Sequence, residues 1–114
     1  MRAAEACHRA WTGGDIGAAI AYISHDIVID SPNGRFEGRL GFEEFTRNFA
    51  VLLKRSTIRA AYGDDTTALL FYDLSFTFGL SCPAAQHDTV RGGEIVHQRY
   101  VWDPAPFLRS LAQC

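Results

Sequence analysis

Four polar side chains recur at every second position in the last two strands that the sequence predicts. Gln86 and Asp88 lie on one of these strands, and Gln98 and Tyr100 lie on the other. Because side chains alternate between the two faces of a strand, each pair shares a face. The carboxyl group of Asp88 could accept or donate a proton, while the amides and the phenol could orient a carbonyl or hydroxyl group.

The face on which these four side chains lie depends on the register of the hairpin. We take Val90, Val96 and Trp102 as inward-pointing anchors, and steps of two then turn the four polar side chains inward as well. Five polar or charged residues face outward on this register: His87, Thr89, Arg91, His97 and Arg99. Buried polar groups need partners, so this inward set predicts a polar pocket. If the register were wrong by one residue, the four would lie on a solvated or dimer face.

Further candidate site residues come from other parts of the chain. Trp11 and Phe49 could form aromatic walls of a ligand cavity, and Trp11 could equally be an ordinary core residue. Ser31 lies on the same side of its strand as the neighbouring isoleucines and could face the cavity, although Ser before Pro is also typical of a turn. Asp73 interrupts an apolar strand, as either a buried acid or a solvent-facing carboxylate.

Two helices at the N-terminus are predicted to form a hairpin. Residues 2–12 have the amphipathic pattern of a helix that covers an apolar surface. Gly13 and Gly14 can end this helix, and Asp15 can cap a second one. We expect the second helix to end at residues 24–26.

A strand, a turn and a third helix should follow this hairpin. Ile27–Ile29 is a β-branched run that favours a strand, and Ser31–Gly34 carries the Pro and Gly of a turn. Residues 40–53 repeat large apolar side chains at helical spacing, which predicts a helix with one face in the core. Helices followed by strands indicate an α+β architecture.

Four strands should then complete the chain, over residues 57–62, 66–78, 84–91 and 94–102. Gly92-Gly93 fits a tight hairpin turn between the last two strands. The run 66–78 is longer than an average strand, as a strongly curved sheet requires. Both of its faces are hydrophobic, so we expect the outer faces of two copies to pack together as a homodimer. A short helix is expected at residues 107–111.

Composition excludes several classes of partner. The 114 residues are 47% hydrophobic and 12% aromatic, which fits one domain over residues 1–114 with a sizeable core. The net charge of −2 offers no basic excess for nucleic acid, and no apolar run is long enough to cross a membrane. A cytoplasmic protein with three reduced cysteines is expected. The four histidines show no ligand spacing, so neither a metal nor another cofactor is expected.

The order of these elements resembles the nuclear-transport-factor-2-like superfamily, in its SnoaL-like and ketosteroid-isomerase-like branch. The matching features are Ala10-Trp11 with Gly14-Asp15, the strand entry at Asp26, Ser31-Pro32 with Gly34, and Phe36-Glu37-Gly38 before a helix. The resemblance implies an α+β fold in which a cone-shaped, curved antiparallel sheet wraps around three N-terminal helices. It also implies a ligand cavity at the open end of the cone and a homodimer.

The resemblance implies an incomplete set of catalytic groups. Ketosteroid isomerases use a Tyr and two acids where this chain offers Cys7, Ser31 and Gln86, none of which replaces a carboxylate base. Relatives that resemble limonene epoxide hydrolase place an acid beside an Arg on the last strand, whereas here Tyr100 follows Arg99. SnoaL-like cyclases use an Asp and a His from the late strands, and the nearest match is Asp88 with His87 or His97.

Two functions therefore remain open at the level of sequence. In the first, the chain is a small-molecule enzyme, such as an isomerase, cyclase or hydrolase, with Asp88 and Tyr100 as its acid–base groups. In the second, it is a non-catalytic ligand-binding or dimerisation module. For both we expect an apolar molecule with one or two oxygen functions, held by a common set of side chains: Trp11, Ser31, Phe49, Gln86, Gln98 and Trp102.

Overall fold

The computed structural model describes residues 2–106, which form three helices and six strands within that range. In chain order these are α1 (Arg2–Thr12), α2 (Ile16–Ile20), β1 (Ile23–Ser31), β2 (Gly34–Glu37), α3 (Gly38–Ala50), β3 (Leu53–Gly63), β4 (Thr67–Phe76), β5 (Ser81–Arg91) and β6 (Glu94–Trp102). The predicted α+β fold class is confirmed. None of the helices in residues 2–106 combines the length and the apolar character needed to cross a bilayer.

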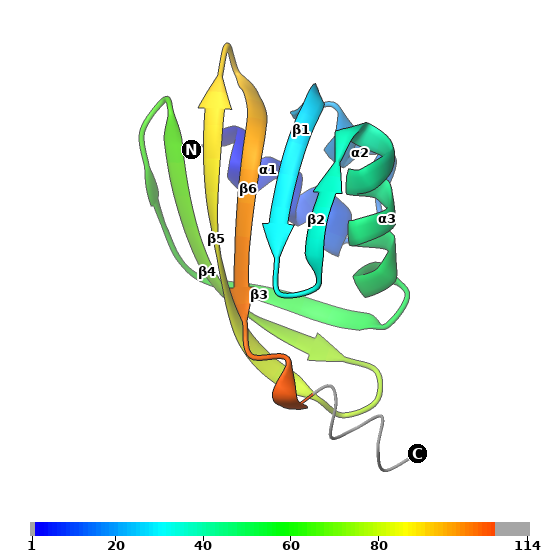
Figure 1. Ribbon diagram of the computed structural model, residues 1–114. Coiled ribbons are helices and arrows are strands. Elements are labelled where there is room, and N and C mark those ends of the chain that lie inside the picture. The colour runs from blue at the N-terminus through cyan, green and yellow to red at the C-terminus, as the bar shows by residue number, and fades with distance from the viewer. Residues whose placement is uncertain (1, 107–114) are drawn as a thin grey trace.

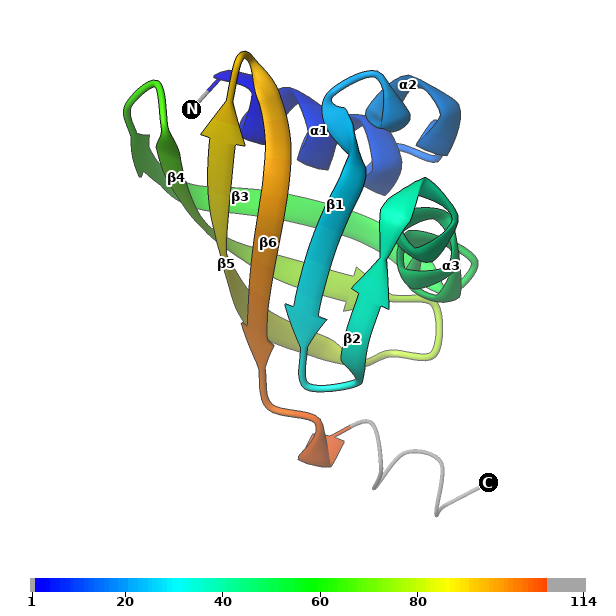
Figure 2. The ribbon, with the colours of Figure 1, turned by 45° about the horizontal axis from the view of Figure 1, so that its top comes forward.

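The six strands form one curved sheet in the order β2-β1-β6-β5-β4-β3. All three helices lie on its concave side, so that the sheet bends around them (Figures 1 and 2). Neighbouring strands run antiparallel except β1 and β6, which pair in parallel. The sheet is therefore mixed, whereas a fully antiparallel one was expected.

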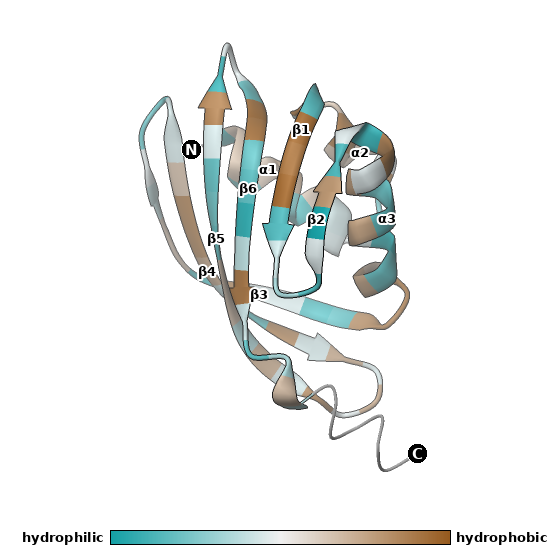
Figure 3. Ribbon diagram, viewed as in Figure 1, coloured by the Kyte–Doolittle hydropathy of each residue, from teal (hydrophilic) through white to brown (hydrophobic). Residues whose placement is uncertain are grey.

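Alternation along the strands separates an inner from an outer face. In β4, Leu70, Tyr72 and Leu74 are among the buried side chains, while Leu69 and Phe71 at alternate positions are exposed. The inner side chains pack against α1 and α3 and form the core, because each helix turns its apolar stripe toward the sheet. Figure 3 shows hydrophilic colours in the middle of β5 and β6, whereas β1 is mostly hydrophobic between its ends.

The N-terminal hairpin forms as predicted, except that α2 is short. The Asp15 side chain accepts a hydrogen bond from the Ala18 amide at 3.0 Å and caps the helix. The helix ends at Ile20, and Ile23 already belongs to β1, where it is fully buried. The Tyr22 carbonyl accepts a hydrogen bond from the Ile95 amide at 2.8 Å, which draws the chain into the sheet before another helical turn can form.

Other element boundaries also differ from the sequence prediction, and the strand expected at residues 66–78 is shorter, β4 ending at Phe76. Gly34–Glu37 forms β2, an antiparallel partner of β1, where only a connection was expected. Helix α3 ends at Ala50, because Leu53 pairs with Phe76 and starts β3. Pro83 lies inside β5, so this strand begins earlier than expected. The helix predicted at residues 107–111 falls outside the described residues.

Candidate functional site

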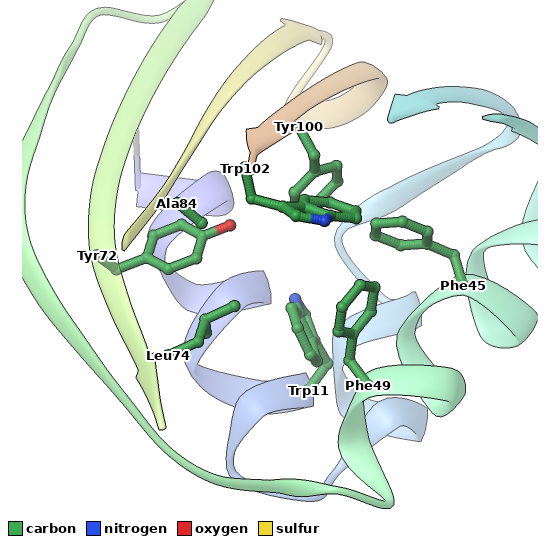
Figure 4. Close-up of a pocket in the computed structure, with 8 residues that line it drawn as sticks. All are labelled: Trp11, Phe45, Phe49, Tyr72, Leu74, Ala84, Tyr100 and Trp102. Carbon is green, nitrogen blue, oxygen red and sulfur yellow. The ribbon is translucent and has the colours of Figure 1, made fainter. Parts of the chain in front are cut away.

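An aromatic pocket lies where α1 and α3 face the inner side of the sheet (Figure 4). Its lining comes from five elements: Trp11 of α1, Phe45 and Phe49 of α3, Tyr72 and Leu74 of β4, Ala84 of β5, and Tyr100 and Trp102 of β6. The free volume is only about 10 Å³, near the minimum that holds one water molecule. The rings therefore fill most of the interior, and a larger ligand requires some of them to move.

The rings that close the pocket are not equally confined. Phe45 packs on Tyr100 with ring centroids 4.7 Å apart, and both side chains are buried. Phe49 and Trp102 contact each other nearly at right angles with centroids 5.1 Å apart, and both are only partly buried. These two side chains have the most freedom to open a path into the pocket.

The indole of Trp11 brings an unpartnered hydrogen-bond donor to this apolar space. Its side chain is 2% exposed, and its Nε1 atom has no hydrogen-bond partner within residues 2–106. Figure 4 shows this nitrogen directed toward the space between the rings, with the Tyr72 hydroxyl turned toward the same space. A buried donor without a partner costs about 1–3 kcal/mol, so an acceptor on a ligand would relieve this cost.

Behind the pocket, two tyrosine–glutamine pairs end on the buried carboxyl group of Asp88. The Tyr72 hydroxyl donates to Gln86 Oε1 at 2.8 Å, and the Tyr100 hydroxyl donates to Gln98 Oε1 at 3.0 Å. Gln86 Nε2 donates to both carboxyl oxygens of Asp88 at 3.0 Å, and Gln98 Nε2 donates to Oδ2 at 3.3 Å. All five side chains are buried, and Asp88 has no exposed surface.

This environment shifts the acidity of the groups it contains. Burial raises the pKa of Asp88 to about 7, against the opposing effect of the hydrogen bonds from Gln98 and Gln86. Burial also raises the pKa of Tyr72 and of Tyr100, so both hydroxyls keep their protons. Asp88 is therefore the group in this network that can gain or lose a proton near neutral pH.

A second polar pair, buried His8 and partly buried Ser56, was not predicted from the sequence. His8 Nε2 lies 2.8 Å from Ser56 Oγ, and the imidazole ring packs on Tyr72 with centroids 4.0 Å apart. Burial lowers the pKa of His8 to about 4, so the ring is neutral at pH 7. The helical spacing of Ala4, His8 and Trp11 on the buried face of α1 is the signal that could have revealed it.

The structure places the four polar side chains of the last hairpin on the inner face, as the sequence analysis expected. The anchor chosen at Val96 is nevertheless wrong. Val90 pairs with Ile95, which is fully buried, and the register shifts before Thr89 pairs with His97. Val96 is the extra residue of this β-bulge and points neither fully in nor out.

The predicted ligand-binding residues do not all come together. Trp11, Phe49 and Trp102 line the pocket, while Gln86 and Gln98 lie behind its tyrosines. Ser31 lies apart from them at the end of β1, where the turn to β2 begins. Its hydroxyl donates to the Gly34 carbonyl at 3.0 Å and accepts from the Asn33 amide at 3.1 Å, so it stabilises the turn.

Other ionisable candidates lie on the outer face. Asp73 forms a 2.7 Å ion pair with Arg59, so it is the solvent-facing carboxylate of the two alternatives. His97 contacts Asp30 at 2.9 Å on the same outer side, and His87 is exposed. Neither histidine contacts Asp88. Within residues 2–106, no three His, Cys, Asp or Glu side chains gather closely enough to hold a metal ion.

The bent sheet around three helices, with an aromatic interior, is the architecture of the nuclear-transport-factor-2-like superfamily. Two solved structures of this shape hold small molecules. A protein with a ketosteroid-isomerase-like fold from Catenulispora acidiphila, in complex with trimethylamine, has a TM-score of 0.76 and 18% identity over 89% of this chain and 85% of its own. TerC, co-crystallised with polyporic acid, has a TM-score of 0.79 and 16% identity over 95% and 94%.

Sequence comparison identifies the family. The SnoaL-like domain matches residues 4–98, and the chain belongs to this family. A protein of known structure from Kribbella flavida is 38% identical, with a TM-score of 0.94, over 98% of this chain and 93% of its own. No curated protein matches the chain.

Proposed function

We propose that this chain binds a small, mainly apolar molecule with one or two oxygen functions in the aromatic pocket. The observation that carries the proposal is the unpartnered Nε1–H of Trp11, buried at 2% exposure and directed into a space lined by aromatic rings. Apolar walls supply affinity through burial, and a few polar groups fix the orientation of the ligand. The small molecules bound by two structures of the same fold support this proposal.

Ligand entry depends on the partly buried rings. The present free volume of about 10 Å³ is far below the few hundred Å³ of ordinary ligand pockets. Phe49 and Trp102 would therefore have to rotate outward when a ligand enters, while the buried Phe45 and Tyr100 stay in place. Binding should thus be accompanied by a change in the environment of Trp102 as well as Trp11.

The two tryptophans give a direct test of this proposal. The chain contains two Trp residues, so a ¹H–¹⁵N spectrum holds two indole N–H signals, and Trp11→Phe assigns them. Titration with 1-indanol and 1-indanone, two bicyclic compounds with one oxygen each, should shift both indole signals. Shifts confined to backbone signals of the outer face would contradict the proposal.

Acid–base catalysis is a second candidate function, favoured by the pKa of Asp88 near 7. This value suits a group that exchanges protons at neutral pH. Since Asp88 does not line the pocket, Tyr100 would contact the substrate and Asp88 would act behind it. For any substrate found, Asp88→Asn should abolish turnover and retain binding, whereas a pure binding module shows no turnover to lose. Asp73→Asn, which removes an outer carboxylate, is the matched control.

We also propose that two copies of the chain pair through the outer face of the sheet. Ala60, Phe71, Ala85 and Val101 form a row across four strands, in which Phe71 is 46% and Val101 57% exposed. The Arg59–Asp73 ion pair flanks this row, and a cluster of Arg35, Asp30 and His97 also lies on the outer side. A patch with both signs of charge around an apolar centre can complement itself about a twofold axis.

A further inference from the structure

The direction of every hydrogen bond behind the pocket follows from the charge on Asp88. An ionised carboxylate only accepts hydrogen bonds, so Gln86 and Gln98 must both turn their amide N–H groups toward it. Each glutamine then presents its carbonyl oxygen to a tyrosine. Both tyrosine hydroxyls therefore donate their single proton away from the pocket, to Gln86 and Gln98.

This direction leaves the pocket with an uneven set of polar groups. Tyr72 and Tyr100 both line the pocket, and their hydroxyl oxygens can offer a ligand only lone pairs, which are acceptors. Trp11 offers a buried donor, its unpartnered Nε1–H, and Figure 4 shows the indole nitrogen of the partly buried Trp102 directed toward the same space. A hydroxyl group on a ligand can satisfy both kinds at once, because it accepts from an indole and donates to a tyrosine. A ketone or ester can only accept from the indoles, and it leaves the tyrosine lone pairs without a donor.

We infer that the pocket selects an alcohol or phenol over a ketone or ester of the same shape, and that Asp88 sets this preference through Gln86 and Gln98. The inference rests on the proposed function, since it names the ligand class of the same pocket. Asp88 is fully buried and does not line the pocket, so it acts as a positioning residue. The two glutamines carry its effect to the tyrosine hydroxyls.

Two arms lead from Asp88 to the pocket, Gln86 with Tyr72 and Gln98 with Tyr100. Protonation of Asp88 should reverse the direction of the hydrogen bonds in one of them. The Gln98 arm is the weaker one, held by a single 3.3 Å bond, whereas Gln86 contacts both carboxyl oxygens at 3.0 Å. A protonated Oδ2 can donate to the oxygen of Gln98 once that amide has turned over. The Gln98 amide then donates to Tyr100, and the Tyr100 proton becomes available to a ligand carbonyl. No covalent bond changes except the one to the proton, which comes from water.

Several ionisable groups act on Asp88 or surround it, and each is a possible alternative cause of a pH-dependent ligand preference. Burial raises the pKa of three of them, Cys7 of α1, Tyr72 of β4 and Tyr100 of β6, so they stay neutral below pH 9. His8 of α1 stays neutral above pH 5, since its pKa is about 4. His97 of β6 acts on Asp88 through space from the outer face. The variant His97→Gln removes this influence.

The test compares indane, 1-indanol and 1-indanone, which share one bicyclic shape and do not ionise between pH 5 and 9. Calorimetric titration at pH 9, where Asp88 is ionised, should show 1-indanol binding about tenfold more tightly than 1-indanone, as expected for one buried hydrogen bond. At pH 5 this preference should shrink to about twofold or reverse. His97→Gln and Asp73→Asn should keep the same pH dependence.

Variants of the network sharpen the test. An Asn at position 88 has a carbonyl oxygen that accepts and an NH2 group that only donates, so one arm is reversed at every pH. Asp88→Asn should therefore show at pH 9 the weak preference that the unchanged chain shows at pH 5. Tyr100→Phe should lose the pH dependence, because the reversible arm ends there, while Tyr72→Phe should retain it. Thermal unfolding of each variant verifies that it is folded. The comparison of pH 5 with pH 9 in the unchanged chain tests the inference even if a variant does not fold.

The outcomes separate this inference from the function on which it rests. If all three compounds bind and 1-indanone equals or exceeds 1-indanol at pH 9, the assigned ligand class is wrong and the pocket remains a binding site. If none of the three compounds binds, the proposed function fails, and the inference fails with it. A tenfold preference at pH 9 that does not change at pH 5 would overturn the role given to Asp88.

Discussion

The inner face of β4, β5 and β6 buries polar side chains, whereas the outer face of the same strands exposes apolar ones. Inside, Gln86, Asp88 and Gln98 are at most 2% exposed, and each has hydrogen-bond partners. Outside, Leu69 and Phe71 are 51% and 46% exposed. An isolated domain has little need of either arrangement, and this contrast supports our proposals of a ligand on the inside and a second copy on the outside.

The largest expected effect is a difference in stability between two Leu→Ala substitutions, one on the inner face and one on the outer face. Leu70→Ala removes a side chain that is 1% exposed, and it should lower the free energy of unfolding by about 2–5 kcal/mol. Leu69→Ala, at the neighbouring outer position, should lower it by less than about 1 kcal/mol in the monomer. Urea unfolding of dilute protein measures both. Equal losses would show that the two faces are not distinguished as the structure has them.

A second large effect should follow from the charge of Asp88. Its pKa rises from 3.8 to about 7 on folding, so between these values its carboxyl group binds more protons in the folded chain than in the unfolded one. This group by itself lowers the free energy of unfolding as the pH rises through this window, whereas His8, whose pKa falls from 6.5 to about 4, acts in the opposite direction. Asp88→Asn should therefore gain stability relative to the unchanged chain between pH 4 and 7, and the gain should reach about 4 kcal/mol at pH 8.

The control for this charge effect lies on the outer face. Asp73→Asn removes a partly exposed carboxylate from the neighbouring strand, and its stability relative to the unchanged chain should not rise between pH 4 and 7. Denaturant unfolding at several pH values measures all three chains. A stability advantage of Asp88→Asn that shrinks from pH 4 to 7 would reverse the sign of this prediction.

Dimerisation through the outer face should be sensitive to a charge introduced there. Phe71→Lys places a cation at the centre of the apolar row and should weaken dimerisation by about 2 kcal/mol or more. Sedimentation equilibrium at micromolar concentration should then give the monomer mass. Val51→Lys, at an exposed apolar position after α3, should leave the dimer intact. A monomer in the unchanged chain would remove the proposed role of this face.

The smallest effect is expected in the turn at Ser31. Ser31→Ala removes two turn hydrogen bonds at an exposed site and should lower the free energy of unfolding by about 1 kcal/mol. Binding of 1-indanol in the pocket should not change, because Ser31 lies outside it. Loss of this binding in calorimetry would return Ser31 to the site that the sequence suggested.

Much of the fold could be predicted because local patterns agree with it. The amphipathic period of α1 and the Gly92-Gly93 turn, with φ of +57° and +81°, depend on neighbours in the sequence. Strand β2 could not be predicted from its four residues, since it exists only by pairing with β1. The parallel contact of β1 with β6 likewise joins segments that are far apart in the chain.

The site was predictable in part for the same reason. Asp88 and Gln86 share a face by simple alternation, so the sequence places them together. Tyr72 enters the network because β4 pairs with β5 in one particular register, which brings Tyr72 within 2.8 Å of Gln86. The unpartnered Nε1–H of Trp11 could not be foreseen, since a missing partner is a property of the whole interior.

The β-bulge at Val96 makes the pocket face of this hairpin tolerant of a change in length at that position. Ile95 and Gln98 are both buried although they lie three positions apart, because the extra residue is absorbed between them. Deletion of Val96 would restore strict alternation from Ile95, with His97 and Arg99 still outward and Gln98 and Tyr100 still inward. Loss or gain of this single codon would thus leave the row of pocket side chains unchanged in evolution.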